Sequence, residues 1–543
     1  MSLTLRGATP ADHAAIVEVF LACWRESYAA VLPARLVDGM TNEQAASLWR
    51  RAMKRSTPDQ LVVAEDGEHA GLAGVLRWHI DEDPNVGWVD SLYVAPRAQG
   101  RGVGGRLIDH AVGALTGAGA TELRLFAFEA NAPAIAFYRR HGWQPDGTTR
   151  VEAEFGEREI RLSRRATAPA TGGRGALQRV AEELVAPTPG ATAGPAGVAI
   201  AVRSEHVDVS VAVGARTVED SPPGLLPMTI DTAHDLASVT KVVTTTALMR
   251  LVSQRLVGLD DPVRRYLPSF TGAEQDRVTV RDLLLHRGGL WEWWPVYAAD
   301  PRNPDAVVDA LPLRYPVGEG HHYSDLGFVL LGRVVAAVAA SPLDAAIAEL
   351  VTSPLGLAAT RFARPHRVDD VAMSAIDDRV ERDMLDSGSP YPVPFTSRDF
   401  DAWRTDPIVG TVNDGNAFHA YGGVSGHAGL FSTIDDLLAL ASALGRATEG
   451  DDLVDPAVAH EFFAPGPDEG QSLGFRRYEI ELDETLTTML GHTGFVGCGV
   501  GFVPGRGISV AVASNRLVTA GEPVSTNDLW AAVVAAAAQE LAP

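Results

Sequence analysis

The sequence contains few cysteines, few lysines and no long apolar run, and each shortage excludes a class of protein. Two of its 543 residues are cysteine, Cys23 and Cys498, which is too few for a disulfide framework or a cysteine-rich zinc site. No apolar run of about 18 residues is free of charge, so no membrane-spanning helix is expected. The segment Met1–Gly7 has no basic stretch followed by an apolar one, so we expect no secretory signal.

Lysine is nearly absent, because Lys54 and Lys241 are the only lysines among 46 basic residues. Arginine cannot lose its proton in a protein, whereas lysine can, so each of these positions raises the question of what arginine could not do there. The net charge of −23 argues against binding to nucleic acid. This charge is uneven, since residues 1–165 carry −2 and the remaining residues carry −21.

A segment rich in small and turn-forming residues, 166–176, predicts a linker between two α/β domains, 1–165 and 177–543. In the first domain the hydrophobic pattern predicts helices at 11–29, 104–117 and 132–141 and strands at 60–64, 70–79, 86–94 and 122–128. In the second it predicts a hairpin at 197–202 and 206–213, helices at 235–256 and 526–541, and strands at 499–503 and 507–513. Because strands stand at both ends of the second domain, we expect one sheet closed by both termini.

A glycine-rich turn joins the strand at 86–94 to the helix at 104–117. Glycine lets the backbone approach a ligand closely, and the N-terminus of a helix offers free N–H groups to an anion. A diphosphate is the natural ligand of such a loop, and an ordinary tight turn before a helix is the alternative. The candidate residues of the loop are Gln99, Gly100, Arg101, Gly102, Val103, Gly104 and Gly105.

The pattern Gln99-x-x-Gly102-x-Gly104, with Arg97 upstream, resembles the acetyl-CoA signature of the Gcn5-related N-acetyltransferases (GNAT). A second segment, from Asn131 to Trp143, resembles the family's "N-x-x-A-x-x-F-Y-x-x-x-G-F" pattern, with tryptophan in place of the last phenylalanine. The resemblance covers nearly all of residues 1–165. It implies a mixed, mostly antiparallel sheet with flanking helices, and acetyl transfer from acetyl-CoA to an amine.

The same resemblance implies roles for individual residues. The backbone of Leu92, Tyr93 and Val94 would hold the pantetheine arm and the acetyl carbonyl, the loop amides would bind the pyrophosphate, and Asn131 would add a cofactor contact. Tyr138 would protonate the leaving thiolate, or else it is only a packed aromatic residue. The base that generates the neutral amine stays open between Glu26, Asp90, Glu129 and water.

In the second domain, Ser238 and Lys241 are three residues apart near the start of the helix predicted at 235–256, so we expect them on one helix face. A serine hydroxyl is a poor nucleophile until a base takes its proton, and a buried lysine can help to do that. One of only two lysines stands at this spacing. The alternative is a solvated helix face, because the Ser-x-x-Lys pattern is common by chance.

Further elements follow in order: Tyr323-Ser324-Asp325 and, near the end, Gly491-His492-Thr493-Gly494. This order resembles the penicillin-recognising serine hydrolases, which include class C β-lactamases, DD-peptidases and related esterases and amidases. His286-Arg287-Gly288-Gly289-Leu290 resembles their "His-Thr-Ser-Gly-Leu" element. The resemblance covers about residues 175–543 and implies a serine β-lactamase-like fold, an antiparallel sheet packed by helices with a helical lobe.

The resemblance implies that Ser238 becomes acylated while Lys241 and Tyr323 carry the proton, with Tyr323 the expected base. Backbone N–H groups of Ser238 and Phe495 would form the oxyanion hole, and Thr493 and Gly494 would line the substrate site. Asp325 departs from the usual asparagine and should raise the pKa of Lys241. His492 replaces the lysine of true β-lactamases, which argues against β-lactam hydrolysis. Tyr323 as a core aromatic and His492 as a structural strand residue are the alternatives.

The segment from Val412 to Thr433 resembles the "D-x-N-A … G-G-x-x-G-H-A-G-L-F-S-T" pattern of a branch that includes N-acetylmuramyl-L-alanine amidases. His427 within it is either functional or a satisfied loop histidine. Among the aromatic residues after His286, Trp291 and Trp294 would form a wall that binds a sugar or an aromatic group, with core packing as the alternative.

We therefore interpret the chain as a bifunctional enzyme, an acetyl-CoA-dependent N-acetyltransferase fused to a serine amidase or esterase, with a muramyl-peptide-like amide as the preferred substrate. Antibiotic inactivation or self-resistance, DD-peptidase activity, and one catalytically silent ligand-binding domain are the alternatives. The expected partners are small-molecule amines and amides or esters, without nucleic acid or membrane. No metal is expected, the expected location is the cytoplasm, and the oligomeric state stays open.

Overall fold

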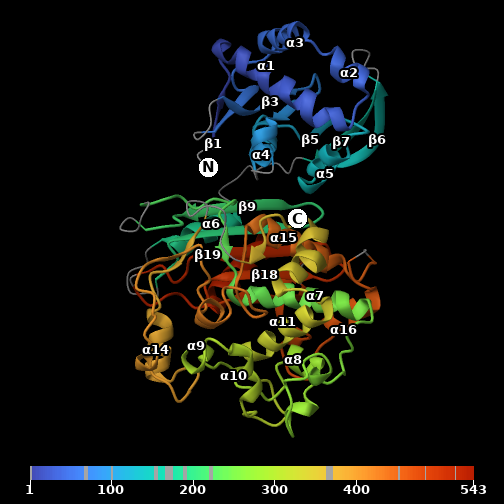
Figure 1. Cartoon of the computed structure of the whole chain (residues 1–543). Helices are drawn as coiled ribbons and strands as arrows, with labels where there is room; N and C mark the ends of the chain where they lie inside the picture. The colour runs from blue at the N-terminus through green and yellow to red at the C-terminus, as the bar shows by residue number, and fades with distance from the viewer. Residues whose placement is uncertain are drawn as a thin grey trace. The chain divides into compact units, whose positions relative to one another are not determined.

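The structure, a computed structural model, describes residues 3–66, 71–99, 102–151, 157–165, 175–186, 193–218, 224–362, 371–450, 453–482, 485–519 and 521–542. The chain forms two compact units, Met1–Gly173 and Arg174–Pro543 (Figure 1). Of the predicted linker, residues 166–174 lie outside the described part, and Ala176 already begins a helix.

The first unit is built on one sheet with the strand order β1-β2-β3-β4-β5-β7-β6. All neighbouring strands are antiparallel except β4 and β5, which run parallel, so the predicted mixed and mostly antiparallel sheet is confirmed. The strands are β1 (Leu3–Gly7), β2 (Leu61–Asp66), β3 (Leu72–Ile80), β4 (Val86–Val94), β5 (Glu122–Phe128), β6 (Gln144–Val151) and β7 (Arg158–Arg165).

Helices flank this sheet. They are α1 (His13–Ala22), α2 (Ala34–Gly39), α3 (Asn42–Arg55), α4 (Val103–Gly117) and α5 (Ala132–Arg140). The helix predicted at 11–29 is shorter as an α-helix, because after Ala22 the chain continues as a π-helical turn, Cys23–Ser27, and a 3₁₀ turn, Tyr28–Ala30. Indole rings of Trp24 and Trp49 are fully buried in the core between α1, α3 and the sheet.

The second unit contains a larger antiparallel sheet with the order β15-β16-β17-β18-β19-β8-β9. The N-terminal hairpin pairs with the C-terminal strand, because β8 aligns Val198 with Ser514 of β19. The prediction of one sheet closed by both ends is thus confirmed. Its strands are β8 (Gly197–Arg203), β9 (Asp208–Gly214), β15 (Gln471–Ser472), β16 (Phe475–Leu482), β17 (Thr485–Gly494), β18 (Cys498–Val503) and β19 (Ile508–Ser514).

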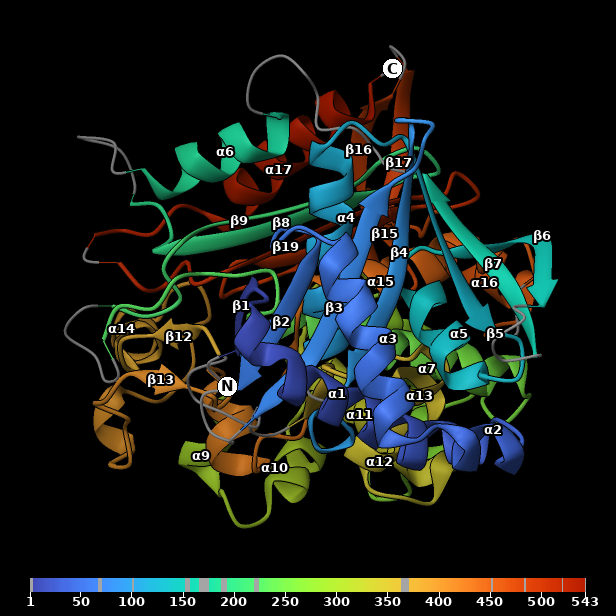
Figure 2. The same ribbon diagram turned by 90° about the horizontal axis from the view of Figure 1, so that it is seen from above.

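Helices cover both faces of this sheet, as the predicted fold class requires. On one face lie α6 (Ala176–Val185) and α17 (Thr526–Leu541), which run side by side in Figure 2; α6 packs on β8 and β9, and α17 packs mainly on β16, β17 and β19. On the other face α15 (Ile434–Arg446) packs on β18 and β19. Residues of α15 and of α7 (Thr240–Ser253) belong to the same large apolar core.

The helical lobe lies beyond α7. It contains α8 (Val280–Leu284), α9 (Val296–Ala299), α10 (Pro304–Ala310), α11 (Asp325–Ala339), α12 (Leu343–Ile347), α13 (Ser353–Leu355), α14 (Arg379–Ser387) and α16 (Pro456–Phe463). Short strands link the lobe to the sheet: β10 (His234–Asp235), β11 (Arg361–Phe362), β12 (Met373–Ala375), β13 (Ile408–Val409) and β14 (Leu430–Ser432).

The long helix predicted at 235–256 is wrong at its N-terminal end. Asp235 belongs to β10, a 3₁₀ turn covers Ala237–Val239, and α7 begins only at Thr240. The cause is local, since the Asp235 carboxylate accepts the N–H of Ala237 at 2.8 Å and Ala237 has a φ of 42°, which no α-helix allows.

Among the residues that the structure describes, no single helix is long and apolar enough to cross a membrane. By length and composition α11 and the segment Leu343–Leu355 pass together, but they are bent by 78° at the break between them.

Candidate functional sites

The Ser238 side chain contacts the only buried lysine of the chain. Lys241 donates a hydrogen bond from Nζ to Ser238 Oγ at 2.7 Å, and its side chain is fully buried. Ser238 lies in the 3₁₀ turn that precedes α7, one residue after the left-handed Ala237. The prediction of a shared α-helix face is thus wrong, because Ser238 precedes α7, but the two side chains still contact each other directly.

A carboxylate neutralises this lysine. Asp325, the first residue of α11, forms an ion pair with Lys241 at 2.7 Å. Burial by itself would lower the pKa of Lys241, but Asp325 and the nearby Tyr323 outweigh it and hold that pKa above its ordinary value. Lys241 is therefore a stable ammonium at neutral pH, in the direction expected from the aspartate at position 325.

Tyr323 lies beside the same ammonium. The Lys241 nitrogen is 5.0 Å from the centre of the Tyr323 ring, and it also interacts with the phenol oxygen. The Tyr323 ring packs against the His286 ring at 4.6 Å, and His286 Nδ1 accepts the N–H of Ser324 at 2.9 Å. The element around His286 thus fixes the backbone that presents Tyr323 to Ser238.

His492 lies on β17, with its ring 5.8 Å from that of Tyr323. Its Nδ1 is 2.6 Å from the carbonyl of Thr493, so Nδ1 carries the proton and Nε2 is a hydrogen-bond acceptor. Burial, Arg476 and Lys241 lower the pKa of His492 well below its ordinary value, so the ring is neutral. The Nε2 atom is buried without a hydrogen-bond partner among the described residues.

The end of β17 lies against the turn that carries Ser238. A Cβ at Gly494 would stand 2.4 Å from the Leu236 carbonyl oxygen, so only glycine allows this approach. Phe495 follows directly, its side chain is 50% exposed, and its carbonyl accepts two hydrogen bonds from Arg516. The close approach brings the two expected oxyanion-hole segments, at Ser238 and Phe495, next to each other.

The segment that resembles the amidase pattern contacts the residues that hold the nucleophile, Asp235 and Lys241. The buried Asp235 carboxylate accepts the N–H of Asn413 at 2.5 Å, and the carbonyl of His427 lies 3.4 Å from Lys241 Nζ. Both ring nitrogens of His427 are paired, Nδ1 with Ser425 at 2.8 Å and Nε2 with Asp414 at 3.0 Å. The side chain of His427 is thus that of a satisfied loop histidine, while its backbone contacts the site.

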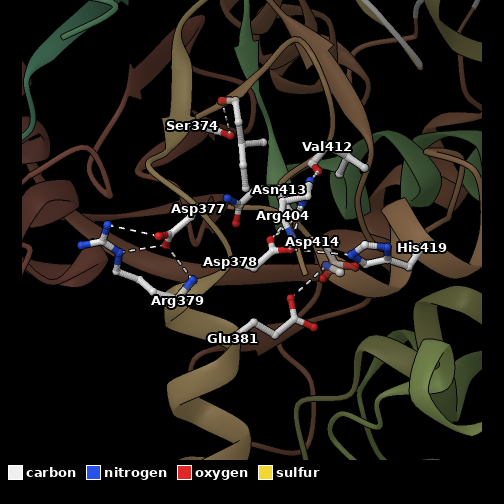
Figure 3. Close-up of polar contacts among 12 residues, drawn as sticks. Ser374, Asp377, Asp378, Arg379, Glu381, Arg404, Val412, Asn413, Asp414 and His419 are labelled. Carbon is white, nitrogen blue, oxygen red and sulfur yellow. Dashed lines mark hydrogen bonds and ion pairs between the residues drawn. The ribbon is translucent and has the colours of Figure 1, made fainter. Parts of the chain in front are cut away.

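A buried polar network extends this support away from the nucleophile (Figure 3). Arg404 forms an ion pair with Asp378 at 2.6 Å and donates to the carbonyls of Val412 and Asn413, which anchors the loop that holds Asp235. Glu381 lies below this pair in Figure 3 and accepts the N–H of Gly415 at 3.0 Å. Burial and the charge of the neighbouring Asp414 raise the pKa of Glu381 to about 8.

The two tryptophans expected to line a substrate wall form an edge-to-face pair, with Trp291 and Trp294 ring centres 4.8 Å apart. Both are partly buried, and the carbonyl of Trp291 accepts the hydroxyl of Ser324 at 2.6 Å, which ties them to the Tyr323 loop. Trp294 also contacts Phe395. Trp293 is by contrast buried in a separate core cluster, so core packing describes it best.

In the first unit the predicted pyrophosphate loop leads into α4. Gly102 has a φ of +79°, and a Cβ there would meet no atom within 4 Å, so the backbone needs glycine and faces open space. The first-turn N–H groups of α4 have no partners within the helix. These features fit a diphosphate. Gly100 and Arg101 lie outside the described residues.

Two of the remaining glycines serve packing as well. A Cβ at Gly104 would lie 3.2 Å from the Phe137 ring of α5, and one at Gly105 would lie 3.3 Å from His141. Asn131 accepts the N–H of Ala134 at 3.2 Å and so caps α5, which is a structural task beside its expected cofactor contact.

Next to the loop, the sheet opens between its two parallel strands. β4 pairs with β5 only over Val86–Val89, so the segment with Leu92, Tyr93 and Val94 has no β5 partner. The Val94 carbonyl accepts hydrogen bonds from the Gln99 side chain and the Cys23 thiol, both at 3.0 Å. An extended ligand such as the pantetheine arm of acetyl-CoA can bind along this open edge.

Tyr138 lies on α5 and is buried, and burial raises the pKa of its phenol, which therefore stays protonated. The phenols of Tyr28 and Tyr93 are close enough to interact with it electrostatically. The carboxylates considered as the base are not buried as Tyr138 is. Glu26 is exposed, Asp90 contacts His79 at 2.8 Å, and Glu129 lies 3.4 Å from Arg158.

Sequence reasoning missed Asp235, which braces the nucleophile turn, and Arg476, whose guanidinium carbon lies 5.1 Å from the centre of the Tyr323 ring. Only the pairing of β16 with β17, which places Arg476 opposite Gly491, could have indicated the second. Within the described part of the chain, no group of three or more histidine, cysteine, aspartate or glutamate side chains is arranged to hold a metal ion.

This geometry agrees with comparisons to known families. Residues 177–535 match the model of the Beta-lactamase family, and residues 16–143 match that of the Acetyltransferase (GNAT) family. The chain thus belongs to the β-lactamase family of serine hydrolases and carries an N-terminal GNAT acetyltransferase domain.

Individual relatives match the second unit. An N-acetylmuramyl-L-alanine amidase of Bacillus subtilis (strain 168) is 30% identical over 310 residues, 52% of this chain and 68% of the relative. A protein of Escherichia coli (strain K12) named "Putative D-alanyl-D-alanine carboxypeptidase" is 29% identical over 324 residues, 53% of this chain and 70% of the relative. The D-amino acid amidase of Ochrobactrum anthropi SV3 shares the fold, with a TM-score of 0.50, 20% identity and coverage of 66% of this chain and 97% of that one.

Proposed function

We propose that the second unit hydrolyses an amide through an acyl-enzyme at Ser238, and that a muramyl-peptide-like amide is its preferred substrate. The observation that carries the proposal is the buried ammonium of Lys241, which contacts Ser238 Oγ at 2.7 Å while Asp325 holds its charge. Such an ammonium is placed to donate a hydrogen bond to the serine oxygen while that oxygen attacks a carbonyl carbon.

In the proposed step the Tyr323 oxygen, as phenolate, takes the proton from Ser238 Oγ while that oxygen forms a bond to the substrate carbonyl carbon. The carbonyl oxygen becomes an oxyanion, which the N–H groups of Ser238 and Phe495 stabilise. When the C–N bond breaks, the proton on Tyr323 passes to the leaving nitrogen. Tyr323 then takes a proton from water, whose oxygen attacks the ester carbonyl carbon. When the ester C–O bond breaks, Tyr323 returns this proton to Ser238 Oγ. Lys241 keeps its proton throughout and orients both oxygens.

The amide preference is supported by the amidase-like segment that contacts Lys241 through the His427 carbonyl, and by the name of the Bacillus relative. The name of the Escherichia relative favours the second candidate, release of a C-terminal amino acid from a peptide. The test is hydrolysis of two muramyl-peptide substrates, one cleaved only at the lactyl–L-alanine amide and one only at a terminal D-alanine, by wild type and Ser238→Ala.

Cleavage of the first substrate alone by the wild type supports the amidase, whereas cleavage of the second alone contradicts it in favour of the peptidase. The Ser238→Ala variant should cleave neither. Cleavage of both substrates by the wild type would remove the preference for the muramyl-peptide-like amide. Cleavage of neither substrate, or a wild-type Ser238 that is not phosphonylated by a serine-directed phosphonate, would contradict the proposed activity.

For the first unit we propose N-acetylation of a small-molecule amine in the cytoplasm. Acetyl-CoA supplies the activated acetyl group when bound. The backbone of Leu92–Val94 and the amides of the Gly102 loop hold it, and the buried Tyr138 hydroxyl donates the proton that the departing thiolate requires. Bifunctionality is tested with one full-length protein: the Ser238→Ala variant should lose hydrolysis and retain the acetyl-CoA consumption of the wild type.

A further inference from the structure

Two backbone N–H groups beside the nucleophile have no hydrogen-bond partner in the part of the chain that the structure describes. One belongs to Ser238, in the turn before α7, and the other to Phe495, in the turn that joins β17 to β18. Backbone groups in folded proteins are almost always paired, so both donors are available to an oxygen of a ligand. The question is what holds the second donor in place.

The turn between β17 and β18 is held through its carbonyl groups by the segment Ser514–Arg516 at the end of β19. The Phe495 carbonyl accepts two hydrogen bonds from the Arg516 side chain, from Nε at 2.9 Å and from Nη2 at 2.6 Å. The Val496 carbonyl accepts the backbone N–H of Arg516 at 3.1 Å, and the Gly497 carbonyl accepts the Ser514 hydroxyl at 2.9 Å. Each carbonyl of the turn thus has a partner in this segment.

These contacts set the direction of the Phe495 N–H. This N–H shares a rigid peptide plane with the Gly494 carbonyl, which accepts the N–H of Gly497 at 2.9 Å. The next peptide plane carries the Phe495 carbonyl, which the Arg516 fork holds from two sides. Since both planes that meet at Phe495 are fixed, the N–H between them cannot rotate away without breaking hydrogen bonds.

Arg516 differs from most buried cations because it has no counter-charge. Its side chain is 5% exposed and forms no ion pair with any carboxylate that the structure describes. Its remaining hydrogen bond goes to another carbonyl, that of Val524, at 2.8 Å. The centre of the Phe495 ring lies 5.0 Å from the guanidinium carbon. Burial lowers the pKa of Arg516 to about 10, so the group stays charged at neutral pH. An unpaired buried charge is costly, which suggests a task beyond packing.

We propose that Arg516 is the positioning residue of the oxyanion hole: it fixes the peptide that presents the Phe495 N–H, and its uncompensated charge favours the oxyanion that forms there. This negative charge exists only while the tetrahedral state forms and breaks, so Arg516 stabilises that state more than the bound substrate. The inference rests on the proposed acyl-enzyme function of Ser238.

The alternative is that Arg516 only stabilises the fold. Two probes distinguish the roles, hydrolysis of p-nitrophenyl acetate and inhibition by phenylboronic acid. In the boronate adduct Ser238 Oγ bonds to boron, the serine proton passes to the Tyr323 phenolate, and boron gains the negative charge. One boron-bound oxygen then occupies the position of the oxyanion. The inhibition constant Ki is a property of the folded protein, whereas a purely structural role changes only how much protein is folded.

In Arg516→Met we expect kcat/KM for the ester to fall about 10- to 100-fold, somewhat less than the loss of a whole oxyanion-hole donor. The Ki of phenylboronic acid should rise by the same factor. Arg516→Lys keeps the charge without the planar fork and should recover part of both. Arg250→Met is the matched control, because Arg250 also donates to a carbonyl, that of Leu350 at 2.6 Å, but lies at the other end of α7. It should lower the melting temperature and leave Ki unchanged.

The outcomes separate this inference from the function on which it rests. If the wild type neither hydrolyses the ester nor is inhibited by phenylboronic acid, the acyl-enzyme function itself is wrong. If the wild type does both, a wild-type Ki in Arg516→Met, or a Ki no higher than that of Arg250→Met, overturns the inference alone. An active wild type that phenylboronic acid does not inhibit also overturns it. Should Arg516→Met not fold, Arg516→Lys decides: a raised Ki supports the inference and an unchanged Ki contradicts it.

Discussion

The two candidate sites are built from different materials. In the first unit the site consists mainly of backbone: the left-handed Gly102, the free N–H groups at the start of α4 and the edge of β4 beyond Val89. In the second unit it consists of side chains that already contact one another, with Lys241 held between Ser238 and Asp325. The first site therefore presents mainly backbone groups to a ligand, whereas the polar side chains of the second site already contact one another.

This difference predicts different responses to substitution. A backbone site tolerates most side-chain changes and fails when the backbone path or the open space is lost. A site of mutually paired, buried side chains fails when one charge is moved, because a remaining buried charge or polar group loses its partner.

Lys241→Arg should have the largest effect. Arginine keeps the charge, but its planar fork cannot occupy the space of a compact ammonium that contacts Ser238 and Asp325 at 2.7 Å each. We expect the rate of Ser238 phosphonylation to fall by about 10³- to 10⁶-fold. Lys54→Arg, at the exposed lysine of α3, is the matched control and should react at the wild-type rate. Equal rates for both variants would exclude Lys241 from the reaction.

Tyr138→Phe should lower acetyl transfer by about 10²- to 10⁴-fold, the usual contribution of a general acid. The change removes one hydroxyl from a buried ring, so the affinity for acetyl-CoA, measured by calorimetry, should stay the same. Turnover is measured as CoA release with a saturating amine. Wild-type turnover would mean that water or another residue protonates the thiolate.

Gly102→Glu should weaken acetyl-CoA binding by about 10- to 100-fold, because the added side chain occupies the open space of the loop and its carboxylate repels a diphosphate. Gly119→Glu is the control for backbone strain. Gly119 also has a positive φ and open space, but it follows the opposite end of α4. The loop assignment fails if the two variants bind acetyl-CoA equally well.

Glu381→Gln should produce the smallest effect, a change of thermal stability that depends on pH. The pKa of Glu381 is raised from 4.5 to about 8 in the folded protein, so the folded state binds more protons than the unfolded state between these values. The contribution of the Glu381 proton to the free energy of unfolding is thus fully present below about pH 4.5 and is lost as pH rises through 8. The variant cannot ionise, so its melting temperature should exceed that of the wild type by a few degrees at pH 9.

At pH 5 the two melting temperatures should nearly coincide. The transition that shifts when Ser238 carries a phosphonate identifies the second unit in the calorimetric trace. Glu205→Gln, in the exposed turn of the β8–β9 hairpin, should show no such pH-dependent difference. A gap that does not grow with pH would mean that Glu381 is not the group that titrates.

Much of the fold could be predicted because its elements follow simple local patterns. The strand at 86–94 and the helix at 526–541 coincide with β4 and α17 residue for residue. The start of α7 could not be predicted, since the interruption depends on the Asp235 carboxylate and on a left-handed alanine, neither of which changes the hydrophobic pattern.

The candidate site shows the same division. Ser238, Lys241, Tyr323 and His492 could be named from the order of short motifs. The tautomer of His492 could not, because it is set by a backbone carbonyl at 2.6 Å. Arg476 also could not, because its place beside Tyr323 depends on the register between β16 and β17 and no local motif contains it.

The sheet of the second unit constrains the order of events during synthesis. The hairpin β8–β9 finds its neighbour β19 roughly 300 residues later in the chain, which at typical translation rates is about 15–60 s of synthesis. Throughout that interval the apolar edge of β8 has no strand to pair with, and such an edge readily recruits other chains. The sheet of the first unit, by contrast, is complete at Arg165. A ribosome that stalls within the helical lobe would therefore release a chain whose acetyltransferase domain can fold, but whose β8 strand has an unpaired edge that can aggregate.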